Sequence, residues 1–424
     1  MFKLACGLFS TPRHFGLCMS VLDLVCVFVS RRRRLYSSLN KCVVLGIETS
    51  CDDTGCAVVD NEGNILGEAL NSQQQVHLRL GGIIPPIARD LHQQHIERVV
   101  GEALSASGLQ PGDLDAVAVT VKPGLPLSLR VGLEYSKQLA RAAAKPLIPI
   151  HHMEAHALTI RMTRQVQFPF LVLLISGGHC LLAVARAVDS FLLLGESLDD
   201  APGEAFDKTA RRLKLRNLPE FESLSGGAAL QAAAARGDPT AFPFPFMLDR
   251  YRDCNFSMAG LKNKVLRHIL RQESLHGVEA DGLIPGVYDL CASFQWAVAR
   301  HLCQRLQRAV EYVALRELLP PERRILVVSG GVACNSYITE RLAVVCAEYG
   351  YTLAVPPPHL CTDNGVMIAW NGVERWVVRA GVTTDLDSVD FQSRCMLGED
   401  GRADVEHAQI KCKWIKDGRL LGWE

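Results

Sequence analysis

Residues 150–157 (IHHMEAHA) hold three histidines and one glutamate, a set of side chains suited to metal chemistry. His152 and His156 are four residues apart, so on a helix both imidazoles lie on one face and can reach the same cation. A protease of the HExxH type needs its glutamate directly after the first histidine, and Glu154 comes one residue too late. The spacing predicts a two-histidine clamp rather than a protease. His151 would point elsewhere, and a helix with ordinary buried histidines is the alternative.

Two histidines do not complete a metal site, and residues 359–370 (HLCTDNGVMIAW) offer a third ligand. Asp363 lies in a TDNG turn that opens a predicted helix. Two histidines and one carboxylate suit Zn²⁺ and Fe²⁺ alike, so the sequence does not choose between these metals. An ordinary helix N-cap is the alternative role for Asp363.

Residues 195–215 combine acidic and basic side chains beside a Gly-Gly turn. The acids are Asp199, Asp200, Glu204 and Asp207, and the bases are Lys208, Arg211, Arg212 and Lys214. The acids could bind ribose hydroxyls or hold a metal-bridged phosphate, and the bases could meet an RNA backbone. A second basic helical face comprises Lys262, Lys264, Arg267 and Arg271. For both stretches, a solvated helical face is the alternative.

The elements that must position these residues follow from hydrophobic patterning. Residues 43–60, 171–186 and 325–335 each begin with a Val/Ile/Leu run that ends in a turn rich in small residues, which predicts buried strands. Apolar spacings of three and four predict helices between them, as in residues 90–107 and 129–144. Alternating strands and helices indicate an α/β protein. Three such turns favour a nucleotide cleft between two related lobes, whereas any single one could be a plain hairpin.

The length, charge and cysteine content of the chain limit what kind of protein it can be. A chain of 424 residues, 48% of them hydrophobic, is expected to form two lobes. The 45 basic and 45 acidic residues balance overall, so any nucleic-acid binding must use a local patch. The 15 cysteines form no CxxC motif, which indicates thiols in a reducing compartment rather than a disulfide framework.

Residues 1–40 differ from the rest of the chain. They carry six Lys/Arg against the single acid Asp23, and four arginines (31–34) follow an apolar run at 15–30. This pattern predicts a mitochondrial presequence. A signal anchor is the alternative, although the apolar run is short for a membrane span. No other stretch is long and apolar enough to cross a bilayer.

Taken together, the motifs resemble the tRNA threonylcarbamoyladenosine transferase family, the TsaD-like proteins once called O-sialoglycoprotein endopeptidases. The matching stretches are, in order, GIETSCDDTG, GGIIPPIARDLH, PGLPLSLRVGLEYSK, HHMEAHA, LLISGGHC, ESLDDAPGEAFDK, NFSMAGLKN, ILVVSGGVACN and CTDNGVMIA. They span residues 43 to about 373. The resemblance implies an α/β, two-lobed actin-like and Hsp70-like ATPase fold with duplicated RNase H-like subdomains.

The resemblance also implies a reaction and a site. A threonylcarbamoyl group would pass from threonylcarbamoyl-AMP to N6 of adenosine 37 in tRNAs reading codons that begin with A. One divalent metal, Zn or Fe, would be held by His152, His156 and Asp363. The positions matching the acyl-adenylate contacts are Leu174, Ile175, Ser176, Gly177, Gly178, Asp207, Gly226 or Gly227, Gln231 and Asn335. Backbone N–H groups of residues 176–179 would neutralise the departing phosphate. No general base is evident, and Glu48, Asp52 and Asp53 are the candidates.

Some features depart from the family pattern. The two glycines in RNLPEFESLSGGAALQ lack a preceding proline and follow a longer loop, Cys180 replaces Thr or Ser, and IARDLH differs around His92. These departures, together with the basic leader, resemble the mitochondrial branch of the family. The resemblance implies a matrix protein that acts as a homodimer. It also implies an upstream synthase that supplies threonylcarbamoyl-AMP.

We expect four regions along the chain. They are a presequence (1–40), an N-terminal lobe (41–150), a C-terminal lobe with the nucleotide and metal site (151–380) and a tail (381–424), with the last helix able to return to the first lobe. The competing functions are an ATP-dependent small-molecule kinase of the same clan, which has no use for paired helical histidines, and the metalloprotease that the spacing of Glu154 disfavours.

Overall fold

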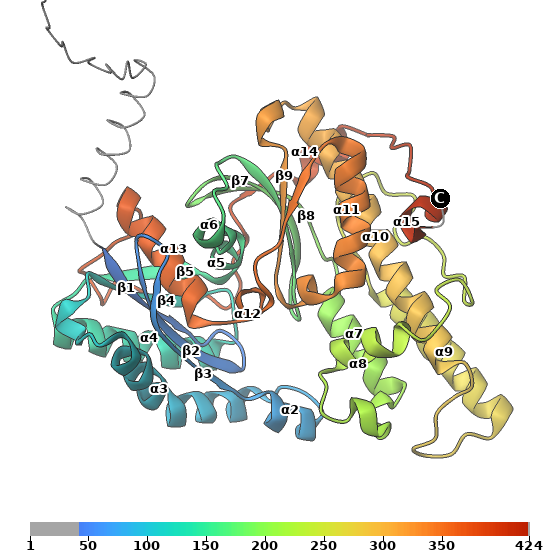
Figure 1. Cartoon of the computed structure of the whole chain (residues 1–424), viewed down its shortest axis with the longest axis horizontal. Helices are drawn as coiled ribbons and strands as arrows, with labels where there is room; N and C mark the ends of the chain where they lie inside the picture. The colour runs from blue at the N-terminus through green and yellow to red at the C-terminus, as the bar shows by residue number, and fades with distance from the viewer. Residues whose placement is uncertain (1–41, 423–424) are drawn as a thin grey trace, which may run out of the picture. The chain divides into compact units, whose positions relative to one another are not determined.

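The computed structural model describes residues 42–422, so the predicted presequence lies outside the described residues. A first sheet has the strand order β3-β2-β1-β4-β5 (Figure 1). Strand β1 is antiparallel to β2 and parallel to β4, and β5 extends the sheet in parallel with β4. The strands are β1 (Val43–Glu48), β2 (Asp53–Asp60), β3 (Ile65–Ser72), β4 (Ala116–Lys122) and β5 (Leu147–His151).

A second sheet repeats this plan in the order β10-β9-β6-β7-β8, with the short β11 added at its far edge. Here β6 is antiparallel to β7 and parallel to β9. The strands are β6 (Phe170–Ile175), β7 (Cys180–Ala187), β8 (Ser190–Glu196), β9 (Ile325–Ser329), β10 (Thr352–Ala354) and β11 (Glu399–Asp400). The repeated topology confirms the predicted two-lobed actin-like α/β fold with duplicated subdomains.

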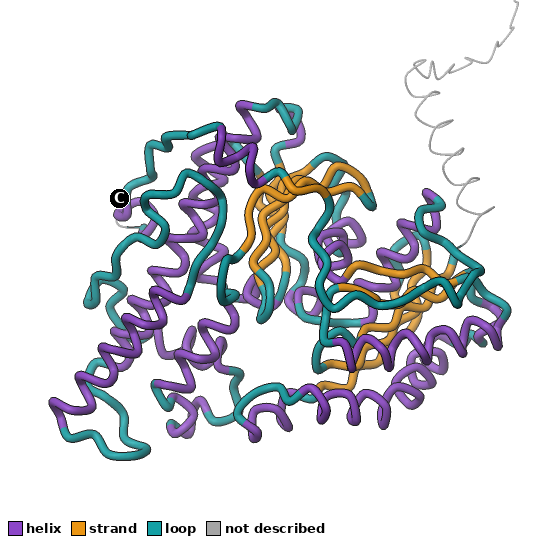
Figure 2. The backbone as a smooth tube through the Cα atoms, turned by 180° about the vertical axis from the view of Figure 1, so that it is seen from behind, coloured by secondary structure: helices purple, strands orange, loops and turns teal. Residues whose placement is uncertain are grey.

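Helices surround both sheets, as the purple tubes around the orange strands of Figure 2 show. The α-helices are α2 (Gln74–Leu80), α3 (Pro85–Ser107), α4 (Pro126–Ala143), α5 (His152–Leu158), α6 (Ile160–Thr163), α7 (Pro202–Arg212), α8 (Gly226–Ala234), α9 (Ala259–His276), α10 (Val287–Leu315), α11 (Ser336–Tyr349), α12 (Pro358–Cys361), α13 (Gly365–Val378), α14 (Arg402–His407) and α15 (Asp417–Leu421). Short 3-10 turns are η1 (Pro111–Asp113), η2 (Leu215–Asn217), η3 (Pro219–Phe221), η4 (Pro321–Arg323) and η5 (Gly331–Cys334). Among the described residues, no helix is long and apolar enough to cross a membrane.

Both sheets are buried on two faces because alternate side chains of a strand point to opposite sides. In β1, Leu45 joins the core under α3 and α4, while Val44 packs against α13. In β6, Leu173 joins the large core with α10 and α11, while Val172 packs against α5 and α6. Continuous apolar runs therefore form these strands, as the sequence predicts.

Helix α13 lies directly on the first sheet, although it follows β10 of the second sheet in sequence. A Cβ atom added to Gly365 would lie 2.3 Å from the carbonyl carbon of Cys56, and one added to Gly46 would lie 2.1 Å from the backbone nitrogen of Ala369. The backbones of helix and sheet thus touch, and this close contact fixes Asp363, two residues before α13.

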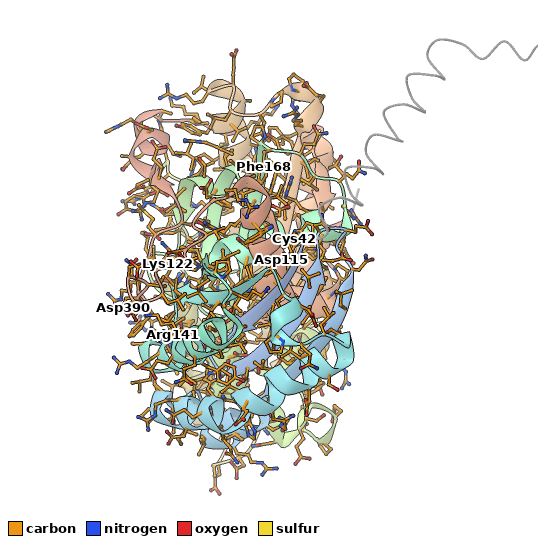
Figure 3. All side chains as sticks on the ribbon, turned by 90° about the vertical axis from the view of Figure 1, so that its left-hand side faces the viewer. Cys42, Asp115, Lys122, Arg141, Phe168 and Asp390 are labelled. Carbon is orange, nitrogen blue, oxygen red and sulfur yellow. The ribbon has the colours of Figure 1, made fainter. Side chains whose placement is uncertain are left out.

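The C-terminal segment 381–422 packs against both sheets. Leu386 and Val389 join the core of the first sheet, and Leu397 joins the core beside α5. Arg141 of α4 forms an ion pair with Asp387, and Figure 3 shows Arg141 on the same side as Asp390. The lobe boundaries at 150 and 380 stay predictions, but the tail is part of the folded body.

Candidate metal centre

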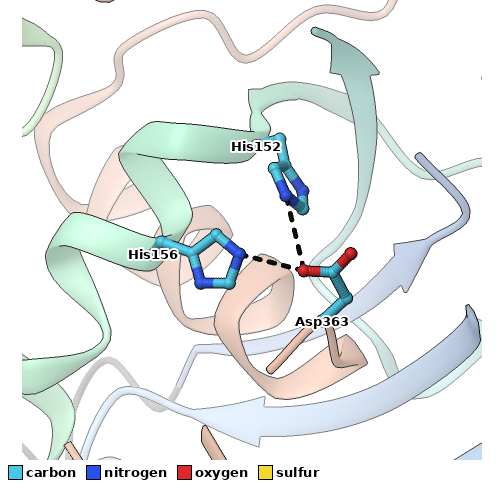
Figure 4. Close-up of side chains that lie close together, drawn as sticks. All are labelled: His152, His156 and Asp363. Atoms are coloured by element: carbon cyan, nitrogen blue, oxygen red, sulfur yellow. Dashed lines mark hydrogen bonds and ion pairs between the residues drawn. The ribbon is translucent and has the colours of Figure 1, made fainter. Parts of the chain in front are cut away.

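Helix α5 starts directly after β5, and this places His152 at the carboxyl end of a buried strand. His156 follows one helical turn later, and the two imidazole rings lie edge to face with centroids 4.7 Å apart. The Nε2 atoms of His156 and His152 lie 3.1 Å and 3.5 Å from Oδ1 of Asp363 (Figure 4). Ligand-type atoms of these three residues lie within 4.8 Å of one another. The structure therefore brings together the three residues that the sequence proposes as ligands.

The spacing and charge of this trio fit a divalent cation. Metal–ligand bonds of about 2.1 Å in a tetrahedral site put neighbouring ligand atoms roughly 3.4 Å apart, which is close to the separations found here. Burial lowers the pKa of His152, but the carboxylates of Asp363 and Glu48 outweigh burial and raise it to about 9. Burial raises the pKa of Asp363, and the two imidazoles overcome this effect and hold it well below its usual range. The site therefore stabilises added positive charge.

A second layer of polar groups orients His152. Its Nδ1 lies 3.3 Å from Oε2 of Glu48 and 3.1 Å from Oγ of Ser50. Glu48 also accepts hydrogen bonds from the Ser50 N–H at 2.5 Å and from the Thr120 hydroxyl. Carboxylates behind metal-bound histidines fix the ring and its tautomer. Because Glu48 is committed to these partners, it is a positioning residue and a poor candidate for the general base.

Replacing Glu48 by Gln keeps the size of this side chain and removes its charge. We expect Glu48→Gln to weaken metal affinity by about 10-fold to 100-fold, the usual cost of losing such an outer partner. Titration with a competing chelator measures the affinity, and circular dichroism checks the fold. An affinity equal to that of the wild type would contradict the positioning role.

The remaining polar residues of the motif have structural partners. Glu154 faces away from the trio and forms a buried ion pair with Arg375 at 2.5 Å, so it is no base for a metal-bound water. His151 caps α5 by accepting from the Met153 N–H, and burial lowers its pKa to about 3. Asn364, not Asp363, caps α13 by accepting from the N–H of Met367 at 2.8 Å. Because Asn364 caps the helix, the Asp363 carboxylate is left facing the histidines.

The Gly-Gly turn after β6 adjoins the trio through His179, a neighbour that nothing in the sequence indicates. The His179 ring centroid lies 6.4 Å from that of His152, and burial lowers the pKa of His179 to about 4. The Ser176 N–H donates to the His179 carbonyl at 2.9 Å, and the His179 N–H donates to Ser176 Oγ. These two N–H groups are used within the turn, which corrects the expectation that residues 176–179 all face a phosphate. The exposed Gly177 and Gly178 are left to do so.

The other residues matched to acyl-adenylate contacts lie around this turn. Strands β6 and β9 are parallel neighbours, so their carboxyl ends, with Ile175 and Ser329, meet at one edge of the sheet. Asp207 of α7 accepts from the Gly227 N–H at 2.8 Å, so the longer loop without its proline still brings these two residues together. Leu174 and Ile175 are buried in opposite cores, so only their backbone can meet a ligand.

Gln231 of α8 lies near Asn335, the residue that precedes α11. Gln231 donates to the hydroxyl of Ser336 at 3.2 Å. The Asn335 side chain caps α11 through the Ile338 N–H and donates to Gln295 at 2.9 Å. Both polar groups of Asn335 are therefore engaged within the protein, and its contact to the acyl-adenylate stays a prediction.

Two acids of the 195–215 stretch, Asp199 and Asp200, anchor the start of α9. Asp199 accepts from Met258 N–H at 2.7 Å and from the Ser257 hydroxyl at 2.5 Å. Asp200 pairs with Lys262 and with Lys208. Lys262 is thus tied to an acid and is not a free RNA contact. Arg212 and Lys214 pair with Glu273.

Of the candidate bases, Asp53 has the more unusual environment. Burial raises its pKa to about 7, and the neighbouring Asp52 adds to the effect. Within residues 42–422, its Oδ1 is buried without a hydrogen-bond partner. His92, whose role the sequence left open, bridges Thr54 and the Cys51 carbonyl and so ties α3 to this turn.

The duplicated topology, with His152, His156 and Asp363 beside an exposed Gly-Gly turn, places the chain in the actin-like class of α/β proteins. The family model for tRNA N6-adenosine threonylcarbamoyltransferase matches residues 64–370, and the chain belongs to that family. It is a transferase that modifies tRNA. This assignment sets aside the kinase and metalloprotease alternatives.

The curated relatives agree with this placement. The chain is 52% identical over 374 residues to the mitochondrial tRNA N6-adenosine threonylcarbamoyltransferase of Xenopus tropicalis, covering 88% of this chain and 92% of that protein. It is 50% identical to that of Homo sapiens, covering 88% and 90%. The crystal structure of T. kodakarensis HypF aligns with a TM-score of 0.49 at 14% identity, over 80% of this chain and 48% of that one.

Proposed function

We propose that the protein transfers the threonylcarbamoyl group of threonylcarbamoyl-AMP to N6 of adenosine 37, in tRNAs that read codons beginning with A. The observation that supports this most is the arrangement of His152, His156 and Asp363 next to the Gly177–Gly178 turn. That arrangement joins a cation site to backbone N–H groups, which suits an anionic phosphate leaving group.

The residues of the chain would act mainly by positioning and by electrostatics. The exocyclic amine of adenine is a poor nucleophile, so the acyl group must arrive on a good leaving group. A divalent metal held by His152, His156 and Asp363 would supply positive charge to offset the phosphate. The N–H groups of Gly177 and Gly178 would donate to its oxygens, and the turn is held by the Gly203 N–H, which donates to the Ser176 carbonyl at 3.1 Å. Asp53 is the candidate that accepts the proton from N6.

Reconstitution tests this function. The purified chain, unmodified tRNA, threonine, bicarbonate, ATP and a threonylcarbamoyl-AMP synthase are incubated together, and the tRNA is digested to nucleosides. We expect threonylcarbamoyladenosine to appear only in tRNAs with adenosine at position 37 that read codons starting with A. Absence of the modified nucleoside, in conditions where a related enzyme produces it, would refute the proposal.

We also propose that the protein works in the mitochondrial matrix. The relatives named above are described as mitochondrial, and residues 1–40 have the basic, acid-poor composition of a presequence. Deleting residues 1–40 should abolish import into isolated mitochondria. A truncated chain that still becomes protected from external protease would show that this leader is not the signal.

The proposed partners are tRNA, threonylcarbamoyl-AMP supplied by an upstream synthase, and a second copy of the chain. The full chain has a mass of 46.5 kDa, and sedimentation of the protein without residues 1–40 should give twice the mass of that shortened chain. A single-chain mass at micromolar concentration would contradict the homodimer. Elemental analysis of the purified protein decides between Zn and Fe.

A further inference from the structure

Two cysteines lie beside the site without belonging to the metal trio. Cys334 ends η5 and immediately precedes Asn335, and Cys361 ends α12 two residues before Asp363. Cys334 is exposed, whereas Cys361 is fully buried. The pair therefore connects an accessible surface to the two segments that deliver Asn335 and Asp363.

Both thiols contact the same short turn, residues 356–358. The Cys334 thiol donates to the Pro358 carbonyl at 3.7 Å, and the Cys361 thiol donates to the Pro356 carbonyl at 3.3 Å. Segments η5 and α12 are in direct contact, and the thiols of Cys334 and Cys361 are hydrogen-bond partners. A disulfide between them requires the two sulfur atoms to approach to about 2.0 Å.

We propose that Cys334 and Cys361 form a reversible disulfide when the protein meets a peroxide, and that this disulfide slows transfer. The Cys334 thiolate attacks one oxygen of hydrogen peroxide, the O–O bond breaks, and a sulfenic acid and a hydroxide form. The Cys361 thiol then attacks the sulfenic sulfur, the S–O bond breaks, and the S–S bond forms as water leaves. Two thiols lose two electrons, and one peroxide is reduced to two waters.

The environment favours Cys334 as the attacking thiol. The interaction with Cys361 lowers the pKa of Cys334 to about 7, so Cys334 forms the thiolate more readily than an ordinary cysteine does. In contrast, burial raises the pKa of Cys254, Cys291 and Cys346 to about 12. Exposure and thiolate character together make oxidation selective for Cys334, with Cys361 in place to resolve it.

The disulfide would act on transfer through the geometry of its neighbours. Asn335 caps α11 and bonds to Gln295, and Asp363 follows α12 by two residues. Drawing η5 and α12 together shifts both, and a misplacement of about 1 Å can cost on the order of 100-fold in rate. The effect on rate depends on the proposed function, whereas formation of the disulfide does not.

The test uses the purified full chain, treated with one equivalent of hydrogen peroxide and then with N-ethylmaleimide. Non-reducing peptide mapping should find a Cys334–Cys361 cross-link, and a phosphine reductant should remove it. The transfer rate should fall by on the order of 10-fold to 100-fold and recover on reduction. Cys334→Ser should keep its basal activity and lose its sensitivity to peroxide. The matched control Cys395→Ser alters another partly exposed thiol and should respond as the wild type does.

Three results would overturn the proposal. One is a map in which Cys334 becomes sulfinic acid while Cys361 stays a free thiol. Another is a complete cross-link with an unchanged transfer rate, which would refute the coupling to the site. The third is equal loss of activity in Cys334→Ser, because oxidation elsewhere would then be responsible. If transfer cannot be detected at all, the peptide map still decides whether the disulfide forms.

Discussion

His156→Ala is expected to reduce bound metal from about one ion per chain to near zero and to lower the transfer rate by at least about 100-fold. The imidazole of His156 is fully buried, and its Nε2 lies 3.1 Å from the Asp363 carboxylate, so its loss removes one of three converging ligand atoms. A metal contributes several kcal/mol of charge stabilisation in such sites, and each 1.4 kcal/mol is worth about ten-fold in rate. Elemental analysis and single-turnover nucleoside assays measure the two effects.

Controls separate this effect from misfolding. His276→Ala removes an exposed imidazole at the end of α9 and should change neither metal content nor rate. Asp363→Asn keeps the volume of the side chain and should also lose the metal if charge is what the site requires. A His156→Ala protein that retains the full complement of metal would refute the ligand assignment.

Gly365→Ala is expected to destabilise the protein by about 3 kcal/mol and to impair metal binding without altering any ligand. The added Cβ would lie 2.3 Å and 2.5 Å from backbone atoms of Cys56 and Ala57, which cannot rotate away. Overpacking of this kind typically costs about 1–3 kcal/mol, and here helix α13 itself must move. Asp363 lies two residues before α13, so it moves with the helix. Thermal unfolding and metal titration measure the two consequences.

Gly101→Ala is the matched control because it adds the same methyl group elsewhere. Gly101 is exposed within α3, and an added Cβ there would meet no atom within 4 Å. Since alanine is the better helix former, this change should stabilise the protein by about 0.5–1 kcal/mol. If Gly365→Ala were as stable as the wild type, the close contact between helix and sheet would not limit this site.

The sequence predicts those parts of the molecule that depend on local periodicity. The strand–turn–strand pattern of residues 43–60 and 171–186 is found as expected, and His152 and His156 share a helix face because their spacing fixes it. The orientation of Glu154 away from the clamp was also predictable from its register, and Glu154 pairs with Arg375.

Side-chain pairings between residues far apart in the chain could not be predicted from the sequence. Asp199 and Asp200 look like ligand groups in sequence. In the structure they instead bond to residues more than fifty positions away, namely Ser257, Met258 and Lys262. Asp363 and Asn364 are equally good caps by composition, and only the placement of α13 on the first sheet decides which one faces the histidines. Glu48 is recognisable as a positioning residue only once β1 and α5 are side by side.

The central claim is that this chain transfers an activated acyl group at the site of His152, His156 and Asp363. The most direct measurement is a single-turnover reaction of the metal-loaded protein with purified threonylcarbamoyl-AMP and unmodified tRNA, without ATP, threonine or bicarbonate. The account predicts one AMP released for each threonylcarbamoyladenosine formed, and neither product with Asp363→Asn. No modified adenosine from the metal-loaded wild type, or equal product from Asp363→Asn, would contradict it.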